Sequence, residues 1–333
     1  MIKVCNLTKE FKTNKKYPGF GGAIKSFFSK EYTIKRAVDD MNFQINDGEV
    51  VGYIGSNGAG KSTTIKMMTG ILTPTSGSIE VDGVIPYEER TRNAMNIGVV
   101  FGQRTQLWWD LPLSESFSLL RDIYGVTEEE YEERMKFFNE VLGIDDFMLS
   151  PVRTLSLGQR MRADLAASLI HNPKILYLDE PTIGLDVVVK EKVRNAIKEI
   201  NNKFNTTVIL TTHDLEDIEE LCNRIIIIDK GVKIYDGSLK EIKEKYGYMT
   251  TVSIQIKQSE TVDSNDVNEY FNLNTEDINT QFEEGKIIVS FNKNKVSATD
   301  IIQYYMKKYT LLDFSLKETS IDDIIKKIYR KEV

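Results

Sequence analysis

The sequence predicts an α/β fold with an inserted helical subdomain, followed by a smaller α+β domain. Short apolar runs alternate with helical patterns through residues 1–240, as in proteins built on a parallel sheet. Residues 114–170 keep only the helical spacing of apolar side chains. Composition shifts again after residue 246. At 333 residues the chain is long enough for more than one hydrophobic core.

The expected elements of the first domain follow from apolar runs bounded by turn residues. A glycine-rich loop separates the first of the buried strands from a helix. Residues 61–68 form the start of the helix after the glycine-rich loop. The strands expected here are residues 50–54, 78–81, 97–101, 175–178, 207–210 and 225–228. A helical subdomain of about residues 104–170 interrupts this pattern.

Two segments stand outside that pattern. Residues 13–36 form a basic, aromatic insertion, which is either a surface loop or a finger that touches a membrane surface or membrane partner. Residues 247–333 are expected to be an accessory domain, with alternating strands at 252–256 and 286–291 and helices from residues 298 and 321. We therefore expect two domains, with boundaries at 1–240 and 247–333.

Composition excludes several classes of function. The two cysteines, Cys5 and Cys222, offer no disulfide framework and fit a reducing cytosol. The only histidines, His171 and His213, are too few for a His-rich metal site. The net charge of −7 argues against a general nucleic-acid binder. No apolar run approaches the roughly 18 residues of a membrane-spanning helix.

The glycine-rich loop predicts a phosphate-binding site. Its sequence, Gly55-Ser56-Asn57-Gly58-Ala59-Gly60-Lys61-Ser62, has the form G-x-x-x-x-G-K-[ST] and lies between a strand and a helix. The glycines let backbone N–H groups approach phosphate oxygens at the helix N-terminus. Lys61 would bind the β- and γ-phosphates, Ser62 would bind Mg²⁺, and Thr63 would support the phosphates. The cofactors expected are ATP and Mg²⁺.

Two carboxylates, Asp179 and Glu180, end the apolar strand at 175–178. Their side chains should emerge at the carboxyl edge of the sheet, where ligands of α/β proteins bind. Asp179 would hold Mg²⁺, and Glu180 would orient and polarise the attacking water. The alternative is that both residues merely end a strand before Pro181.

A third motif, Leu155-Ser156-Leu157-Gly158-Gln159, stands between these two and is followed by a helical pattern. This order resembles the ATP-binding cassette (ABC) ATPases over residues 1 to about 240. The resemblance implies a RecA-like P-loop core with antiparallel β and helical subdomains. It also implies that Ser156, Gly158 and Gln159 bind the γ-phosphate of a second copy, so that two cassettes pack head to tail around two ATP molecules. Leu157 stands where the family most often has glycine.

The resemblance assigns further residues by their position between the motifs. Gln103 would contact Mg²⁺ and the attacking water, and His213 would hold Glu180 and that water in register. Asp186 belongs to a loop that crosses the dimer interface. Phe11 occupies the place of an adenine-stacking aromatic, with Tyr17 and Tyr32 as rivals.

The same resemblance implies a membrane partner. Trp108 and Trp109 follow Gln103 in a loop-like stretch, and we expect the region from Gln103 to Pro112 to dock a separate permease subunit. Residues 182–186, the tryptophan pair and the basic insertion look like cassettes of ABC-2 type exporters. The protein would then lie at the inner face of the cell membrane, as a dimer of itself or with a related cassette.

Several alternatives stay open at this point. An importer cassette would share the same site, and a non-transport ABC ATPase is a further possibility. A translation-factor member would need tandem cassettes, and a DNA-repair member would need a long coiled coil. A P-loop kinase or a GTPase belongs to another class, but the Asn-Lys-x-Asp guanine reader of GTPases is absent.

Overall fold

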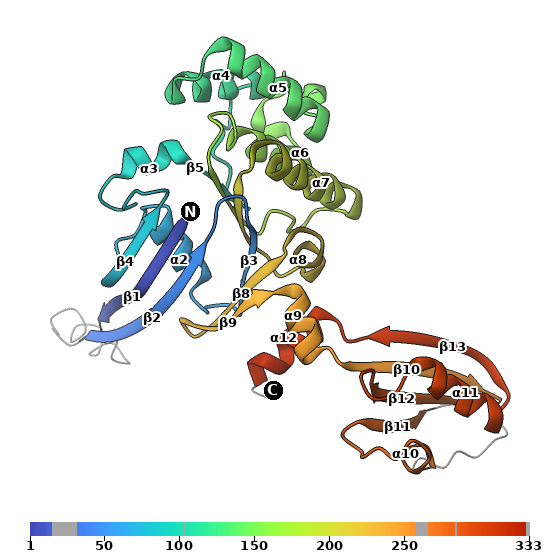
Figure 1. Ribbon diagram of the computed structural model, residues 1–333. Helices are drawn as coiled ribbons and strands as arrows, with labels where there is room; N and C mark the ends of the chain where they lie inside the picture. Colours follow the sequence, from blue (N-terminus) through green and yellow to red (C-terminus); the bar gives the residue numbers. More distant parts are fainter. Residues whose placement is uncertain (15–31, 103, 258–265, 284, 331–333) are drawn as a thin grey trace, which may run out of the picture. The chain divides into compact units, whose positions relative to one another are not determined.

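The computed structural model describes residues 1–14, 32–102, 104–257, 266–283 and 285–330. The chain divides into two compact units, Met1–Gly237 and Ser238–Val333. In Figure 1 the first unit runs from blue through green to orange, and the second from orange to red. The expected insertion at 13–36 falls largely on residues 15–31, which lie outside the described part of the chain.

A six-stranded sheet forms the centre of the first unit, in the order β5-β6-β7-β3-β8-β9. The first five of these strands run parallel to their neighbours. Their side chains are almost all apolar and buried, as expected of a parallel sheet covered on both faces. The strands are β3 (Val50–Gly55), β5 (Ile97–Phe101), β6 (Ile175–Asp179), β7 (Thr207–Thr211), β8 (Arg224–Asp229) and β9 (Val232–Ser238).

A second sheet of the first unit is antiparallel and has the order β2-β1-β4. Its strands are β1 (Ile2–Asn14), β2 (Tyr32–Ile45) and β4 (Ser76–Val81). β1 and β2 pair as far as Asn14 and Tyr32, so both ends of the expected insertion belong to a long hairpin. Apolar residues of this sheet and of β3 share one core, which includes Ile2, Met41 and Tyr53.

Seven α-helices of the described first unit accompany these sheets. They are α2 (Lys61–Met68), α3 (Arg90–Asn96), α4 (Leu113–Tyr124), α5 (Glu128–Leu142), α6 (Leu157–Ala167), α7 (Val187–Phe204) and α8 (Leu215–Leu221). α4, α5 and α6 form the helical region that the sequence predicts, drawn in green in Figure 1. Within the described residues, none of the helices is both long and apolar enough to cross a membrane.

The second unit has the element order α-β-α-β-β-α-β-α. Its antiparallel sheet has the order β11-β12-β10-β13, and its core includes Val252, Phe291 and Tyr305. The strands are β10 (Met249–Ile256), β11 (Ile278–Glu283), β12 (Lys286–Asn292) and β13 (Leu311–Glu318). The helices are α9 (Leu239–Tyr246), α10 (Asp266–Phe271), α11 (Ala298–Lys308) and α12 (Ile321–Arg330).

The predicted fold class is therefore confirmed, although the sequence reading missed several elements. β2, β9, β11 and β13 were not among the expected strands. β13 escapes detection because seven of its eight residues are exposed, so it shows no contrast between a buried and an exposed face.

Candidate functional site

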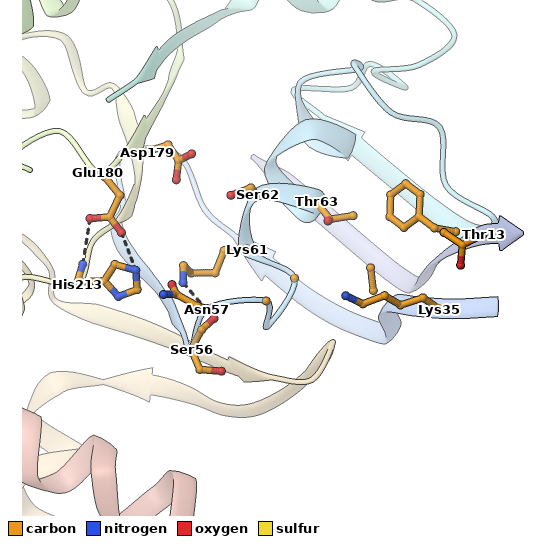
Figure 2. A pocket seen from close by; sticks show the side chains of 14 residues that line it. Thr13, Lys35, Ser56, Asn57, Lys61, Ser62, Thr63, Asp179, Glu180 and His213 are labelled. Atoms are coloured by element: carbon orange, nitrogen blue, oxygen red, sulfur yellow. Dashed lines mark hydrogen bonds and ion pairs between the residues drawn. The ribbon is translucent and has the colours of Figure 1, made fainter. Parts of the chain in front are cut away.

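A cavity of about 440 Å³ brings the glycine-rich loop, the carboxylates after β6 and the residue after β7 together. β3, β6 and β7 are parallel neighbours, so their carboxyl ends meet at one edge of the sheet. The residues around this cavity, most of them labelled in Figure 2, are Phe11, Thr13, Lys35, Ala37, Ser56, Asn57, Gly58, Gly60, Lys61, Ser62, Thr63, Asp179, Glu180 and His213.

The loop between β3 and α2 needs its glycines for close backbone approach. Gly60 precedes α2 with φ +110°, and a β-carbon there would lie 2.6 Å from the carbonyl oxygen of Ala37. Lys61 donates to the carbonyl of Gly55 and lies inside the curve of the loop. Burial lowers the pKa of Lys61, while the carboxylates of Glu180 and Asp179 act in the opposite direction. An anion in this loop would therefore compensate a partly desolvated ammonium group.

Asp179 is held at the end of β6 by its neighbour strands. The hydroxyl of Thr211 donates to Asp179 Oδ1 over 2.5 Å, and the Gly102 N–H donates to the Asp179 carbonyl over 2.8 Å. Asp179 and Ser62 line the main cavity and also an adjoining cavity of about 540 Å³. One hydroxyl and one carboxylate beside a phosphate loop are a donor set that suits Mg²⁺, which binds through few protein ligands.

Glu180 and His213 form a direct pair. The His213 backbone N–H donates to Glu180 Oε2 over 3.2 Å, and ring atom Nε2 lies 3.2 Å from Oε1 (Figure 2). Burial raises the pKa of Glu180, and the His213 ring and Lys61 act against this rise. A carboxylate with a raised pKa beside a phosphate loop can accept a proton from water.

The signature motif does not join this cavity within the described chain. Ser156 is exposed and caps α6 by accepting from the Gln159 N–H over 3.2 Å, while Gln159 Oε1 accepts from the Ser156 N–H. Gly158 instead faces Val189 of α7, because a β-carbon at Gly158 would lie 2.9 Å from Val189 Cγ1. Asp186 caps α7 by accepting from the Val189 N–H.

Phe11 lies at the main cavity, whereas Gln103 is not described by the structure. Gln103 lies outside the described residues, and its neighbours Gly102 and Arg104 line the adjoining cavity. Phe11 lines the main cavity, and Tyr32 is not among its lining residues. The third candidate for an adenine-stacking residue, Tyr17, also lies outside the described part of the chain.

The sequence reading missed part of the cavity wall. Thr13 and Lys35 lie within the segment that it assigned to a surface insertion, yet both line the main cavity. Lys35 is the partner of Phe11 in the β1–β2 hairpin. Asp229, at the end of β8, accepts from the Ser56 hydroxyl over 3.2 Å. Lys35 could have been predicted as a cavity residue only from the pairing of β1 with β2, and no sequence motif indicates that pairing.

Comparison with known proteins identifies the family. A family model described as ABC transporter matches residues 38–183. The ABC transporter ATP-binding protein NatA of Bacillus subtilis is 33% identical over 217 residues, which cover 65% of this chain and 88% of that protein. The chain belongs to the ABC transporter ATP-binding proteins. It is the ATP-binding subunit of a transporter, and the predicted family is confirmed.

Relatives and solved structures add to this assignment. The methionine import ATP-binding protein MetN 2 of Enterococcus faecalis is 29% identical over 290 residues, covering 86% of this chain and 82% of that protein. The ATP-binding cassette MJ0796, solved as a dimer in a post-hydrolysis state with ADP and Pi, matches with a TM-score of 0.60 and 28% identity, over 72% of this chain and 99% of its own. The cassette described here is accordingly an ATPase.

Proposed function

We propose that this cassette powers export across a membrane through a separate permease, by ATP-driven head-to-tail pairing of two cassettes. The observation that carries the pairing is the separation of two half-sites in one chain. The phosphate loop and the Glu180–His213 pair share a cavity, whereas Ser156 and Gly158 lie outside it at an exposed helix N-terminus. A helix N-terminus binds anions, so a second copy could complete the cavity.

We assign the chemistry to the residues around the cavity. The loop 55–62 binds the phosphates, Lys61 neutralises them, and Phe11 stacks on the base. Mg²⁺, held by Ser62 and Asp179, would neutralise charge on the phosphates. Glu180 accepts a hydrogen bond from the attacking water and takes its proton, and His213 holds the Glu180 carboxylate in position. Gln103 remains part of this proposal as a contact to Mg²⁺ and the attacking water, and Asp186 as a residue of the loop that crosses the interface with the partner cassette.

The permease contact is proposed for the loop between β5 and α4. Trp108 and Trp109 are 38% and 50% exposed, although large aromatic side chains are usually buried. Exposed aromatic pairs of this kind are typical of protein interfaces. Together with the stretch 182–186 and the basic insertion at 13–36, they are the features that resemble ABC-2 exporters. Import is the alternative, and the similarity to MetN 2 favours it. In either direction the cassette would lie at the inner face of the membrane.

The experiment that tests the proposed ATPase cycle is the exchange Glu180→Gln. The variant keeps the side-chain shape but removes the group that accepts the proton, so ATP turnover should fall by roughly 10²–10³. ATP should still bind, and it should hold two copies together because hydrolysis no longer releases them. Phosphate release and light scattering after size-exclusion chromatography measure both effects. Wild-type turnover in this variant would show that Glu180 is not the base.

Direction and cargo need the native complex. Copurification of the cassette with its membrane partner, followed by transport assays in vesicles, would identify the substrate. Accumulation of substrate on the cassette side of the membrane upon ATP addition would show that the protein imports its substrate and would contradict the proposed export.

A further inference from the structure

The buried carboxylate of Asp164 connects the signature helix to the loop that we assign to the permease. Asp164 lies in the third turn of α6 and is 6% exposed. Its Oδ1 atom accepts from the Thr105 hydroxyl over 2.8 Å and from the Gln106 N–H over 3.1 Å. The Gln106 side chain donates in turn to the Asp164 carbonyl over 3.2 Å. Thr105 and Gln106 begin the loop that leads to the exposed tryptophans.

The same loop is attached on the other side of the signature. The N–H groups of Val152 and Arg153 donate to the carbonyls of Leu111 and Trp109 over 3.0 and 2.9 Å. On α6, the Arg160 guanidinium lies 5.8 Å from the centre of a Trp109 ring. The loop is therefore attached both before and after Ser156. Of these attachments, the two bonds to the Asp164 side chain are accepted by a buried carboxylate, and hydrogen bonds to an ionised group are the stronger kind.

We propose that Asp164 is a positioning residue that transmits a displacement of the loop 105–112 to the signature at Ser156. The proposal rests on the proposed permease contact. A rigid helix carries a shift at Asp164 along its axis to its first turn, because its backbone hydrogen bonds resist bending. A permease that moves Trp108 and Trp109 would thereby move Ser156 towards or away from the partner's nucleotide. Removing the carboxylate leaves the loop held to α6 by weaker and more exposed contacts.

Two exchanges separate hydrogen bonding from charge. Asp164→Ala removes both side-chain bonds, whereas Asp164→Asn keeps an oxygen that accepts from Thr105 and Gln106. In the native complex purified from membranes, we expect Asp164→Ala to lower the stimulation of ATP turnover by the permease roughly tenfold. Asp164→Asn should retain most of that stimulation. Glu133→Ala, which changes an exposed carboxylate on α5 of the same helical region, serves as the matched control and should behave as wild type.

A measurement on the isolated chain keeps the proposal independent of complex assembly. Hydrogen exchange at the Gln106 amide should accelerate in Asp164→Ala and stay slow in Asp164→Asn. Normal stimulation in Asp164→Ala, with a freed Gln106 amide, would overturn the proposal. Equal losses of stimulation in both variants would do so as well, since the Asn side chain preserves the acceptor.

The outcome is distinguishable from failure of the proposed function. If isolated wild-type chains do not hydrolyse ATP and Glu180→Gln chains do not pair with ATP, the catalytic assignment is wrong whatever Asp164 does. If those assays succeed while Asp164→Ala couples normally, only the role of Asp164 is wrong. If Asp164→Ala unfolds on purification, Asp164→Asn becomes the deciding variant. A loss of permease stimulation in Asp164→Asn would then contradict the proposal.

Discussion

At the scale of single residues, the site depends on side chains held in constrained positions. Glu180 has a backbone φ of +59°, in the left-handed region that residues other than glycine rarely adopt. Its N–H donates to the Thr211 carbonyl over 2.9 Å, and its carbonyl accepts from the Ile183 N–H over 3.3 Å. These bonds and the His213 contacts hold the carboxylate at the cavity. Backbone strain of this kind persists where surrounding structure enforces it, and it is common at active sites.

Leu157 stands where the family most often has glycine, and its surroundings explain how the fold accommodates the larger side chain. A β-carbon at Gly184 would lie 3.2 Å from Leu157 Cδ2, and Gly184 has φ +73°. The leucine therefore lies beside a residue that has no side chain, while the capping pair Ser156–Gln159 keeps its geometry. The sequence alone showed the departure but not the glycine that accommodates it, because the two residues are distant along the chain.

Asp164 leads to a pH prediction at the same scale. Burial raises the pKa of Asp164 to about 6, against the lowering effects of the Thr105 and Gln106 hydrogen bonds and of Arg160, the charged group that acts on it. Because the pKa of Asp164 is higher in the folded than in the unfolded state, its protonated form contributes stability to the fold. This contribution is fully present below about pH 4 and is lost as the pH rises through about 6. Asparagine does not titrate. The variant Asp164→Asn should therefore gain stability relative to wild type as the pH rises.

The expected gain is at most about 3 kcal/mol in the free energy of unfolding, the value for a shift of roughly two pKa units. Urea unfolding of both proteins at about pH 4.5 and about pH 7.5 measures it. A constant difference between the two proteins at both pH values would contradict a raised Asp164 pKa. Glu133→Gln, at an exposed carboxylate, is the control for the change in net charge.

At the scale of elements, strands and helices could be predicted where the sequence carries a clear local pattern of apolar and turn residues. The glycine-rich loop lies between β3 and α2 because strand, turn and helix signals all occur within residues 50–68. The attachments of loop 105–112 were not predictable, because Thr105 and Asp164 are separated by 59 positions. Local patterns indicate which face of a helix is buried, but they do not identify the residue that contacts a buried polar side chain.

The exposed tryptophans give a prediction for the loop itself. Exchanging Trp108 and Trp109 for alanine should leave ATP turnover of the isolated chain within about twofold, since neither residue lines the nucleotide cavity. Stimulation by the permease and copurification with it should both fall, because tryptophan is enriched among the interface residues whose truncation costs about 2 kcal/mol or more. Asp164→Ala should lose stimulation but still copurify. An equal loss of turnover with and without the permease would instead assign the tryptophans to core packing.

At the scale of the whole molecule, the proposed nucleotide site belongs to one of the two compact units. Every residue around the main cavity lies within Met1–Gly237, and each unit has a hydrophobic core cluster of its own. A ligand that binds only the folded state stabilises the part of the chain that forms its site. The main cavity is thus built from residues of the first unit, and we expect the first unit to bind the nucleotide without the second.

A chain ending at Ser238 tests this separation. It keeps β9 complete (Val232–Ser238) and every residue of the cavity. We expect it to bind ATP with a dissociation constant within about threefold of that of the full chain. At about 100 times that constant, ATP should add about 2.7 kcal/mol to the stability of both proteins. Thermal unfolding with and without ATP measures the gain, and Lys61→Ala in each background removes the phosphate contact as a control. A shortened chain that folds but gains nothing from ATP would show that residues 239–333 contribute to the nucleotide site.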